Sequence, residues 1–221
     1  MATTFLILSD THDDAFPDPV SLPSRVDVVL HCGDLTMIGG LSNYKKAIAN
    51  IKVIDAELKL VIAGNHDNLI EDEDDPEEPV QALALFTAEK GNGLHFLEEG
   101  THKFTLSDGR TFRFDPGVEH PIPEGVDIVM THGPPLLPSQ DYMLDINLEG
   151  NHYGCPMLYN AIRQARPKLH CFGHLHEGYG FGSLKPRAWE DGCTVLVNAA
   201  VMGHGEENNN KPWVVRLELD Y

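Results

Sequence analysis

Five short apolar segments of this chain each lead directly into an aspartate, an asparagine or a histidine. They read TFLILSD, VDVVLHCGD, LKLVIAGNHD, VDIVMTHG and KLHCFGHLH, and they lead to residues 10, 34, 65, 132 and 174. A short apolar run bounded by glycine and turn residues is typical of a strand buried on both faces. Because ligands bind at the carboxyl ends of strands in open α/β sheets, these five segments predict polar side chains that converge on one site.

Between and after these segments, the sequence alternates helix-like and strand-like patterns. The spacing of apolar residues predicts helices over 36–51, 80–89 and 154–166, the second opened by Pro79. Short alternating strands are expected at HFLEEG, THKFTL, RTFRFD, CTVLVNAA and PWVVRLEL, with SDG as a hairpin turn. The pattern predicts a central sheet region with helices outside and an antiparallel continuation.

The composition is that of a globular chain, with 42% hydrophobic residues and a mean hydropathy of −0.23. The apolar runs are far shorter than the roughly 18 residues that a membrane span needs. The N-terminal sequence MATTFLILSD lacks the basic region and cleavage site of a signal peptide. We therefore expect a cytoplasmic protein with no membrane association. Without a linker-like segment or an internal repeat, one domain over residues 1–221 is expected.

The charge of the chain excludes some partners. Its formal net charge is −18, from 16 basic and 34 acidic residues, and the basic residues form no cluster. A nucleic-acid surface needs basic side chains to neutralise phosphates, so none is expected here. A small phosphorylated substrate still fits, because bound divalent ions can supply positive charge locally.

The four cysteines form no CxxC pair and no zinc-finger spacing, so we expect reduced thiols. Cys32 and Cys171 fall inside predicted buried strands, where cysteine behaves as a small hydrophobic residue. Each directly follows a histidine, and we interpret His31 and His170 as core residues, not as metal ligands.

The motifs D-x-H, G-D, G-N-H-D, T-H-G-P-P and G-H-L-H occur in this order. Together they resemble the calcineurin-like metallophosphoesterase superfamily, and the resemblance runs from residue 5 to about residue 200. T-H-G-P-P, G-H-L-H-E-G-Y-G and V-N-A-A are similar to the small metallophosphoesterase-domain-containing proteins, a subgroup linked to phosphodiester and nucleotide hydrolysis. The resemblance implies an α/β fold with a β-sandwich core flanked by helices and with ligands at the carboxyl ends of strands.

The resemblance also implies two divalent metal ions bridged by the carboxylate of Asp34. The remaining ligands that it assigns are Asp10, His12 and His176 for the first ion and Asn65, His132 and His174 for the second. Mixed imidazole and oxygen ligands suit Mn, Fe, Zn, Ni or Co better than Ca. We favour Mn, with Mg as a further candidate.

Two residues of the G-N-H-D motif are candidates for catalysis. His66 is not a ligand in this family, and it is placed to protonate the leaving group or to stabilise developing charge. Asp67 is the nearest carboxylate in sequence and could keep His66 protonated. An equally weighted alternative is that Asp67 has no catalytic role and is a helix cap or a solvated loop residue.

Two departures from the family pattern bear on the substrate. The segment GDLTMIGG lacks the Asp-Arg-Gly of protein phosphatases, which disfavours that activity. The segment 114–125 is shorter than in the related subgroup, so a wall of the substrate pocket is expected to be reduced. The leading hypothesis is a hydrolase of small or nucleotide phosphodiesters; the alternatives are a phosphomonoesterase of the same fold and a weakly active metal-binding scaffold. The sequence leaves the oligomeric state open.

Overall fold

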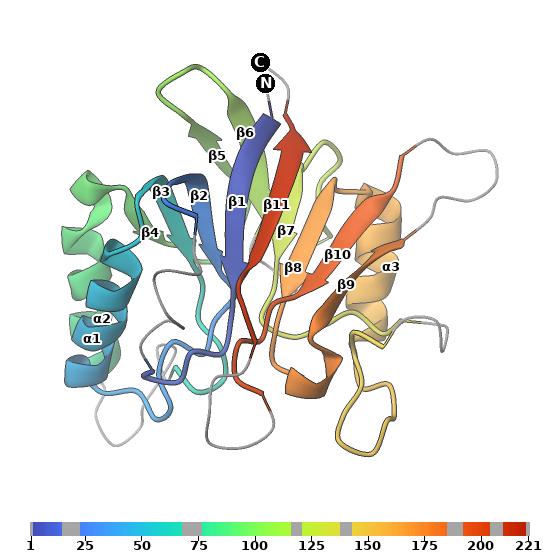
Figure 1. Ribbon diagram of the computed structural model, residues 1–221, viewed down its shortest axis with the longest axis horizontal. Helices are drawn as coiled ribbons and strands as arrows, with labels where there is room; N and C mark the ends of the chain where they lie inside the picture. The colour runs from blue at the N-terminus through green and yellow to red at the C-terminus, as the bar shows by residue number, and fades with distance from the viewer. Residues whose placement is uncertain are drawn as a thin grey trace.

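The computed structural model describes residues 2–14, 23–67, 77–115, 121–137, 143–184, 192–203 and 210–219. Two β-sheets pack face to face, with helices on the outside of each sheet (Figure 1). The first sheet has the strand order β11-β1-β2-β3-β4, and the second has the order β5-β6-β7-β8-β10-β9. The expected α/β sandwich flanked by helices is confirmed.

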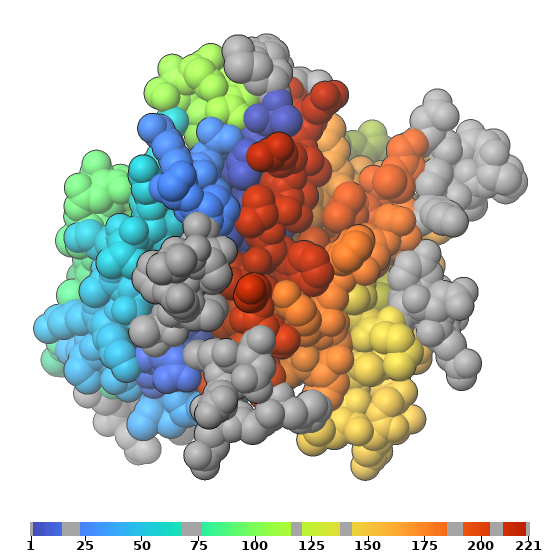
Figure 2. Space-filling view, in the orientation of Figure 1, coloured from blue at the N-terminus to red at the C-terminus, as the bar shows by residue number. Residues whose placement is uncertain are grey.

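The first sheet is parallel except for its last strand. Its strands are β1 (Ala2–Leu8), β2 (Val26–His31), β3 (Ala56–Val61), β4 (Leu94–Phe96) and β11 (Trp213–Glu218). β11 pairs antiparallel with β1, and its surface runs down the middle of the front face in Figure 2. The strands before it all run the same way, so their carboxyl ends lie at one edge.

The second sheet has a parallel centre and a hairpin at each side. Its strands are β5 (His102–Thr105), β6 (Thr111–Asp115), β7 (Ile128–Met130), β8 (Leu169–Phe172), β9 (Gly180–Leu184) and β10 (Thr194–Asn198). β6, β7, β8 and β10 pair in parallel, whereas β5 and β9 are antiparallel edge strands. The carboxyl ends of the central strands therefore also share one edge.

The central strands are buried on both faces, as their apolar runs predict. In β1, Phe5 and Ile7 belong to the core between the sheets, while Leu6 and Leu8 pack in a separate cluster on the other face. The outer face of the first sheet is covered by α1 (Leu41–Lys52) and α2 (Glu77–Ala88), and that of the second by α3 (Pro156–Ala165). Two 3₁₀ turns, η2 (Lys90–Asn92) and η3 (His176–Gly178), complete the described elements.

The helix expected from residue 36 begins only at Leu41. Gly39 and Gly40 have φ angles of 75° and 95°, which end any helical path before them. The strand β9 was not expected, because G-F-G-S-L has little strand propensity and is held by its pairing with β10. The second and third helices lie close to their predicted positions.

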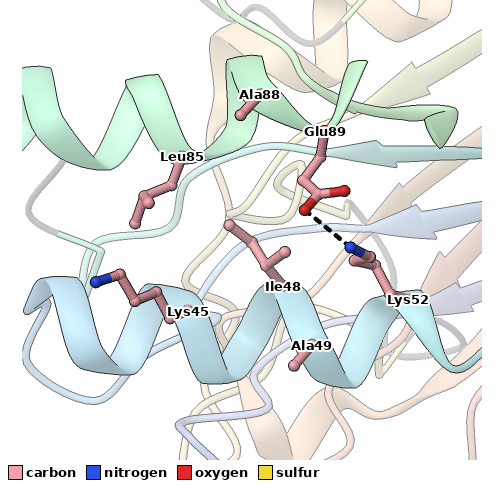
Figure 3. Close-up of a pocket in the computed structure, with 7 residues that line it drawn as sticks. All are labelled: Lys45, Ile48, Ala49, Lys52, Leu85, Ala88 and Glu89. Atoms are coloured by element: carbon pink, nitrogen blue, oxygen red, sulfur yellow. Dashed lines mark hydrogen bonds and ion pairs between the residues drawn. The ribbon is translucent and has the colours of Figure 1, made fainter. Parts of the chain in front are cut away.

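α1 and α2 leave a shallow groove on the outer surface, lined by Lys45, Ile48, Ala49, Lys52, Leu85, Ala88 and Glu89 (Figure 3). Lys52 Nζ, at the end of α1, lies 2.9 Å from Oε1 of Glu89, the residue that follows α2. The groove contains none of the predicted site residues. In the part of the chain that the structure describes, no helix is long and apolar enough to cross a membrane.

Arg110, in the turn between β5 and β6, ties the second sheet to the amino-terminal end of the first. Its guanidinium donates to Asp27 Oδ1 at 2.9 Å and to Thr3 Oγ1 at 2.8 Å, and its side chain is only 7% exposed. The hydrogen bond from Arg110 lowers the pKa of Asp27 below its usual value. The charged form of Asp27 therefore stabilises the folded protein.

We expect Asp27→Asn to lower the free energy of unfolding by about 1 kcal/mol at pH 7, because an ion pair whose carboxylate is still partly exposed to solvent contributes roughly that much. A carboxyl whose pKa is lower in the folded state stabilises the protein above its unfolded pKa of about 3.9. The difference should therefore shrink as the pH falls below about 4 and vanish below the lowered pKa of the folded state. Urea denaturation across this range measures it, with Glu124→Gln, at an exposed residue, as control. A difference that does not change with pH would contradict this account of Asp27.

Candidate metal centre

The loops that follow β1, β2 and β3 meet the loops that follow β7 and β8 at the carboxyl edge of the sandwich. Backbone hydrogen bonds join the two sheets there: Ser9 N–H donates to Ala199 C=O and Val201 N–H to Ser9 C=O, both at 2.9 Å. Asp10 follows directly, and its carboxylate accepts the backbone N–H of His174 at 3.0 Å. Polar side chains from both sheets are therefore held within one small volume.

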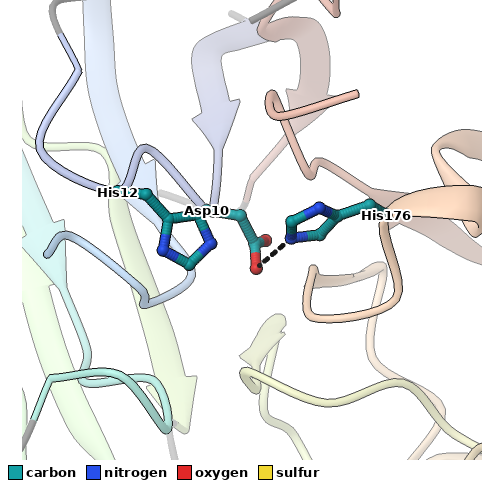
Figure 4. Close-up of side chains that lie close together, drawn as sticks. All are labelled: Asp10, His12 and His176. Carbon is teal, nitrogen blue, oxygen red and sulfur yellow. Dashed lines mark ion pairs between the residues drawn. The ribbon is translucent and has the colours of Figure 1, made fainter. Parts of the chain in front are cut away.

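A first group of predicted ligands consists of Asp10, His12 and His176, whose possible ligand atoms all lie within 4.8 Å of one another. Figure 4 shows the two imidazoles on either side of the Asp10 carboxylate. His176 Nε2 lies 3.3 Å from Asp10 Oδ1. Two residues that follow the first sheet and one that follows the second thus contribute to this group.

A second group forms around the side-chain oxygen of Asn65. His132 Nε2 and His174 Nδ1 lie 2.8 Å and 2.9 Å from Asn65 Oδ1. The two rings pack edge to face, with centroids 5.0 Å apart. An amide oxygen and two imidazole nitrogens thus point toward one another, in the combination that the resemblance assigns to the second ion.

Asp34 lies between the two groups and is 2% exposed. Its Oδ2 is 3.7 Å from His12 Nε2 and 3.3 Å from His132 Nε2. One carboxylate oxygen therefore faces a ring nitrogen of each group, which is the placement that a bridging ligand requires.

These separations, 2.8–3.7 Å, come within about 0.3 Å of those that a shared metal ion imposes. Donor atoms about 2.1 Å from a common ion lie roughly 3.0–3.4 Å apart in tetrahedral or octahedral geometry. His132 Nδ1 donates to Cys32 C=O at 2.9 Å, which turns Nε2 toward the other donors. His12 Nδ1 is buried without a hydrogen-bond partner in the described structure, so Nε2 is its nitrogen that faces the carboxylates. All seven predicted ligands are brought together.

The electrostatics of the metal-free centre show how strongly it attracts positive charge. Burial disfavours the charged form of Asp10, yet its hydrogen bond with His176 and the charge of His132 lower its pKa to about 2. Burial also opposes charge on His132, but Asp34 and Asp10 raise the pKa of His132 to about 9. The buried carboxylates thus stay ionised by holding a cation beside them.

The backbone at this centre is unusual for residues other than glycine. The left-handed φ angles are 57° at Asp10, 43° at His12, 53° at Asp34 and 67° at His174. Such conformations cost about 1–3 kcal/mol each and cluster at functional sites. Four of the seven predicted ligands therefore sit on strained backbone that the surrounding structure must hold.

Two glycines allow the ligand loops to approach one another. A Cβ atom on Gly64 would lie 2.1 Å from Asp34 Oδ1, and one on Gly173 would lie 2.1 Å from Asp10 Oδ2. No side chain fits at such distances, so the glycines of G-N-H-D and G-H-L-H are required by the carboxylates beside them.

His66 lies at the edge of the centre. Its ring meets that of His12 edge to face at a centroid distance of 4.9 Å. Its Nδ1 lies 2.8 Å from Met37 C=O, so Nδ1 carries the proton and donates it. The loop with Met37 is held in turn by Asp13, whose Oδ2 accepts the Met37 N–H at 3.0 Å. The sequence contained no local signal for Met37 as a partner of His66.

Asp67 does not serve as the carboxylate partner considered for His66. It is fully buried, and its oxygens accept the backbone N–H groups of Leu35, Thr36 and Gly64 at 2.9–3.1 Å and the Thr36 hydroxyl at 3.0 Å. Asp67 thus joins the loop after β2 to the loop after β3. This contact pattern agrees with the structural alternative, in which Asp67 organises the loop.

His31 and His170 are buried core residues, as predicted. Burial lowers the pKa of His31 to about 4 and that of His170 to about 3, so both rings are neutral at pH 7. His31 Nε2 lies 3.0 Å from Thr11 Oγ1, and His170 Nε2 lies 2.9 Å from Thr131 Oγ1. Cys32, Cys155, Cys171 and Cys193 are free thiols, as expected.

We expect Gly173→Ala to displace Asp10 or His174 and to lower metal content well below that of the wild type. The added methyl group would lie 2.1 Å from Asp10 Oδ2 and 2.2 Å from Ser9 Oγ, and relieving such overlap typically costs about 1–3 kcal/mol. Elemental analysis and thermal melts test this. Gly133→Ala is the matched control, because a Cβ atom there meets nothing within 4 Å although the residue adjoins His132. Equal metal content in the two variants would refute the close-approach argument.

Comparisons with known proteins agree with this geometry. The human metallophosphoesterase domain-containing protein 1 is 32% identical over 245 residues, which cover 97% of this chain and 71% of that protein. UPF0046 protein C25E10.12 of Caenorhabditis elegans is 29% identical and covers 97% of this chain and 81% of its own length. The crystal structure of TT1561 of Thermus thermophilus has the same fold, with a TM-score of 0.55 at 12% identity over 89% of both chains.

The family model for calcineurin-like phosphoesterases matches residues 3–178, which contain all seven predicted ligands. That match includes every loop from which the centre is built. The chain therefore belongs to the calcineurin-like phosphoesterase family, whose members are metal-dependent phosphoester hydrolases, and it is related to the small metallophosphoesterase-domain-containing proteins.

Proposed function

We propose that this protein is a dinuclear phosphodiesterase that hydrolyses small or nucleotide phosphodiesters, with Mn as the favoured metal. The observation that carries the proposal is the position of Asp34 Oδ2, 3.7 Å from His12 Nε2 and 3.3 Å from His132 Nε2. The shared oxygen supports two ions held side by side, with three further ligands for each.

Two bound divalent ions would neutralise charge on the phosphoryl oxygens and lower the pKa of a water molecule to make a nucleophile. The chain contributes the arrangement. Asp34 would be shared by the two ions, and Asn65 would add a neutral oxygen ligand that leaves the second ion strongly Lewis acidic. Asp67 holds the loops that carry these two residues in register through the N–H groups of Leu35 and Gly64.

The preference for a diester over a monoester rests on the relation of the chain to the small metallophosphoesterase-domain-containing proteins. The motifs T-H-G-P-P, G-H-L-H-E-G-Y-G and V-N-A-A carry that similarity. A phosphomonoester carries about 1.5 to 2 negative charges at pH 7, whereas a diester carries one. The two substrate classes can therefore be compared directly by their rates of turnover.

We propose that His66 acts in its doubly protonated, imidazolium form: it gives the Nε2 proton to the leaving oxygen and becomes a neutral ring that keeps its Nδ1 proton. Its Nδ1–H is held by Met37 C=O, which fixes the ring and leaves Nε2 for substrate. The loop 36–40 that carries Met37 is in turn fixed by Asp13 and by the two glycines that delay the start of α1. The reduced segment 114–125 lies partly outside the described residues, so the open substrate pocket stays a prediction.

We expect the purified protein to bind two Mn ions and to hydrolyse an aryl phosphodiester faster than the matching monoester. Asp34→Asn should lower occupancy at both sites, whereas Asn65→Ala should weaken mainly one, because only Asp34 is shared. Elemental analysis and turnover of both esters measure this. Asp127→Asn, which removes an ion pair with Lys168 away from the centre, is the control. One ion at saturation would sink the dinuclear proposal, a faster monoester would favour the phosphomonoesterase, and metal binding without turnover would favour a scaffold.

For His66 we expect His66→Gln to reduce turnover by roughly 10²–10⁴-fold with metal content retained, which is the usual contribution of a positioned general acid. The loss should be larger for an alkyl leaving group than for an activated aryl one, because a phenolate needs little protonation. Rates measured on a series of leaving groups test this. Equal losses across the series would leave His66 with a positioning role only.

A further inference from the structure

We infer that Asn198 is a positioning residue that sets the orientation of the His174 and His176 ligands and ties their loop to the neighbouring segment 143–153. Asn198 is the second residue of V-N-A-A and touches no predicted ligand side chain in the described structure. The inference rests on the proposed metal centre and adds a residue to which no role in that centre has been given.

The contacts of Asn198 are few and specific. Its side-chain amide donates to Leu175 C=O at 2.8 Å and to Leu144 C=O at 2.9 Å. Its Oδ1 accepts the N–H of Ala200 at 3.2 Å. Asn198 is completely buried, so removing the amide donor would cost the Leu144 carbonyl this hydrogen bond and the Leu175 carbonyl one of its two.

Leu175 is the residue between the two histidine ligands. Its carbonyl accepts both the Asn198 amide and the N–H of Gly178. The first histidine of the pair, His174, is in a left-handed conformation, so this stretch has little regular structure to fix it. A hydrogen bond to the Leu175 carbonyl therefore restrains the peptide planes on which both imidazoles depend.

Asn198 itself is held firmly by the second sheet. Asn198 ends β10, where it pairs with Phe172 of β8 and with Gly180 of β9. A Cβ atom on Gly178 would lie 2.3 Å from the Leu144 carbonyl oxygen and 2.9 Å from Asn198 Nδ2. The loop 173–178 (the ligand loop), which carries both histidine ligands, is therefore packed against both residues. Through its hydrogen bond to Leu175, Asn198 thus fixes the loop that carries His174 and His176 to the sheet.

The segment 143–153 has a second attachment that does not involve the ligand loop. Asp145 is fully buried, and its carboxylate accepts Leu137 N–H at 3.0 Å and lies 2.7 Å from His152 Nδ1. We expect Asp145→Asn to loosen the segment, and it alters no group of the Asn198–Leu175 bond. This variant is therefore a matched control for Asn198→Asp.

The experiment measures Mn affinity by titration calorimetry and the melting temperature of the metal-free protein for the wild type, Asn198→Asp and Asp145→Asn. Asn198→Asp keeps the shape of the side chain and removes the donor. We expect it to weaken at least one Mn site by about 10–100-fold, the usual effect of removing a group that orients a metal ligand. Asp145→Asn should change Mn affinity by less than about threefold while lowering the melting temperature.

Unchanged Mn affinity in Asn198→Asp, with or without a lower melting temperature, would overturn the inference and leave the proposed function standing. Equal weakening in both variants would also overturn it, because the effect would then come through the segment 143–153. A wild type that binds no Mn would remove both the metal centre and the inference. If Asn198→Asp does not fold, Asn198→Ala, which removes the donor without adding a charge, is measured against the same criteria.

Discussion

Two carboxylates, Asp10 and Asp34, are buried beside each other where the two sheets meet, and the rest of the centre follows from that placement. Burying an ionised group away from water is unfavourable unless opposite charge or hydrogen bonds compensate it. Against the effect of burial, the carboxylates raise the pKa of His132 and of His176, so either ring can hold a positive charge beside them. Bound divalent ions would meet the same electrostatic requirement with twice the charge each, and the imidazoles would then act as neutral ligands.

The same placement explains the irregular backbone. A strand that ended in an ordinary turn would carry its side chain away from the facing sheet. The left-handed residues at Asp10, Asp34 and His174 instead bend each loop back across the edge. Gly64 and Gly173 have no side chain where the carboxylates pass. The strain is confined to loops, and the parallel strands behind them, packed on both faces, hold it in place.

The sequence was sufficient to predict the strands and the residues at their ends, because both depend on local patterns of apolar residues followed by polar ones. The sequence was insufficient to predict features that depend on a contact between residues far apart in the chain. α1 begins only after Gly39 and Gly40, and the loop before it reaches His66 through Met37, 29 residues away in the chain. The carboxylate of Asp67 meets donors 31 and 32 residues earlier in the chain, which nothing in G-N-H-D indicates. The edge strand β9 is held by its pairing with β10. Its glycines have little strand propensity, so nothing in its sequence indicated a strand.

The geometry of the candidate metal centre depends on how the two sheets are positioned relative to each other. The first sheet and its loops supply Asp10, His12, Asp34 and Asn65, while the second supplies His132, His174 and His176. Arg110 fastens the sheets together at the opposite edge through Asp27. A shift of one sheet against the other would therefore separate the two halves of the ligand set, whereas ions bound between them would oppose that shift. A ligand that binds only the folded state stabilises it, so metal ions held by these residues would also act as cross-links between the sheets.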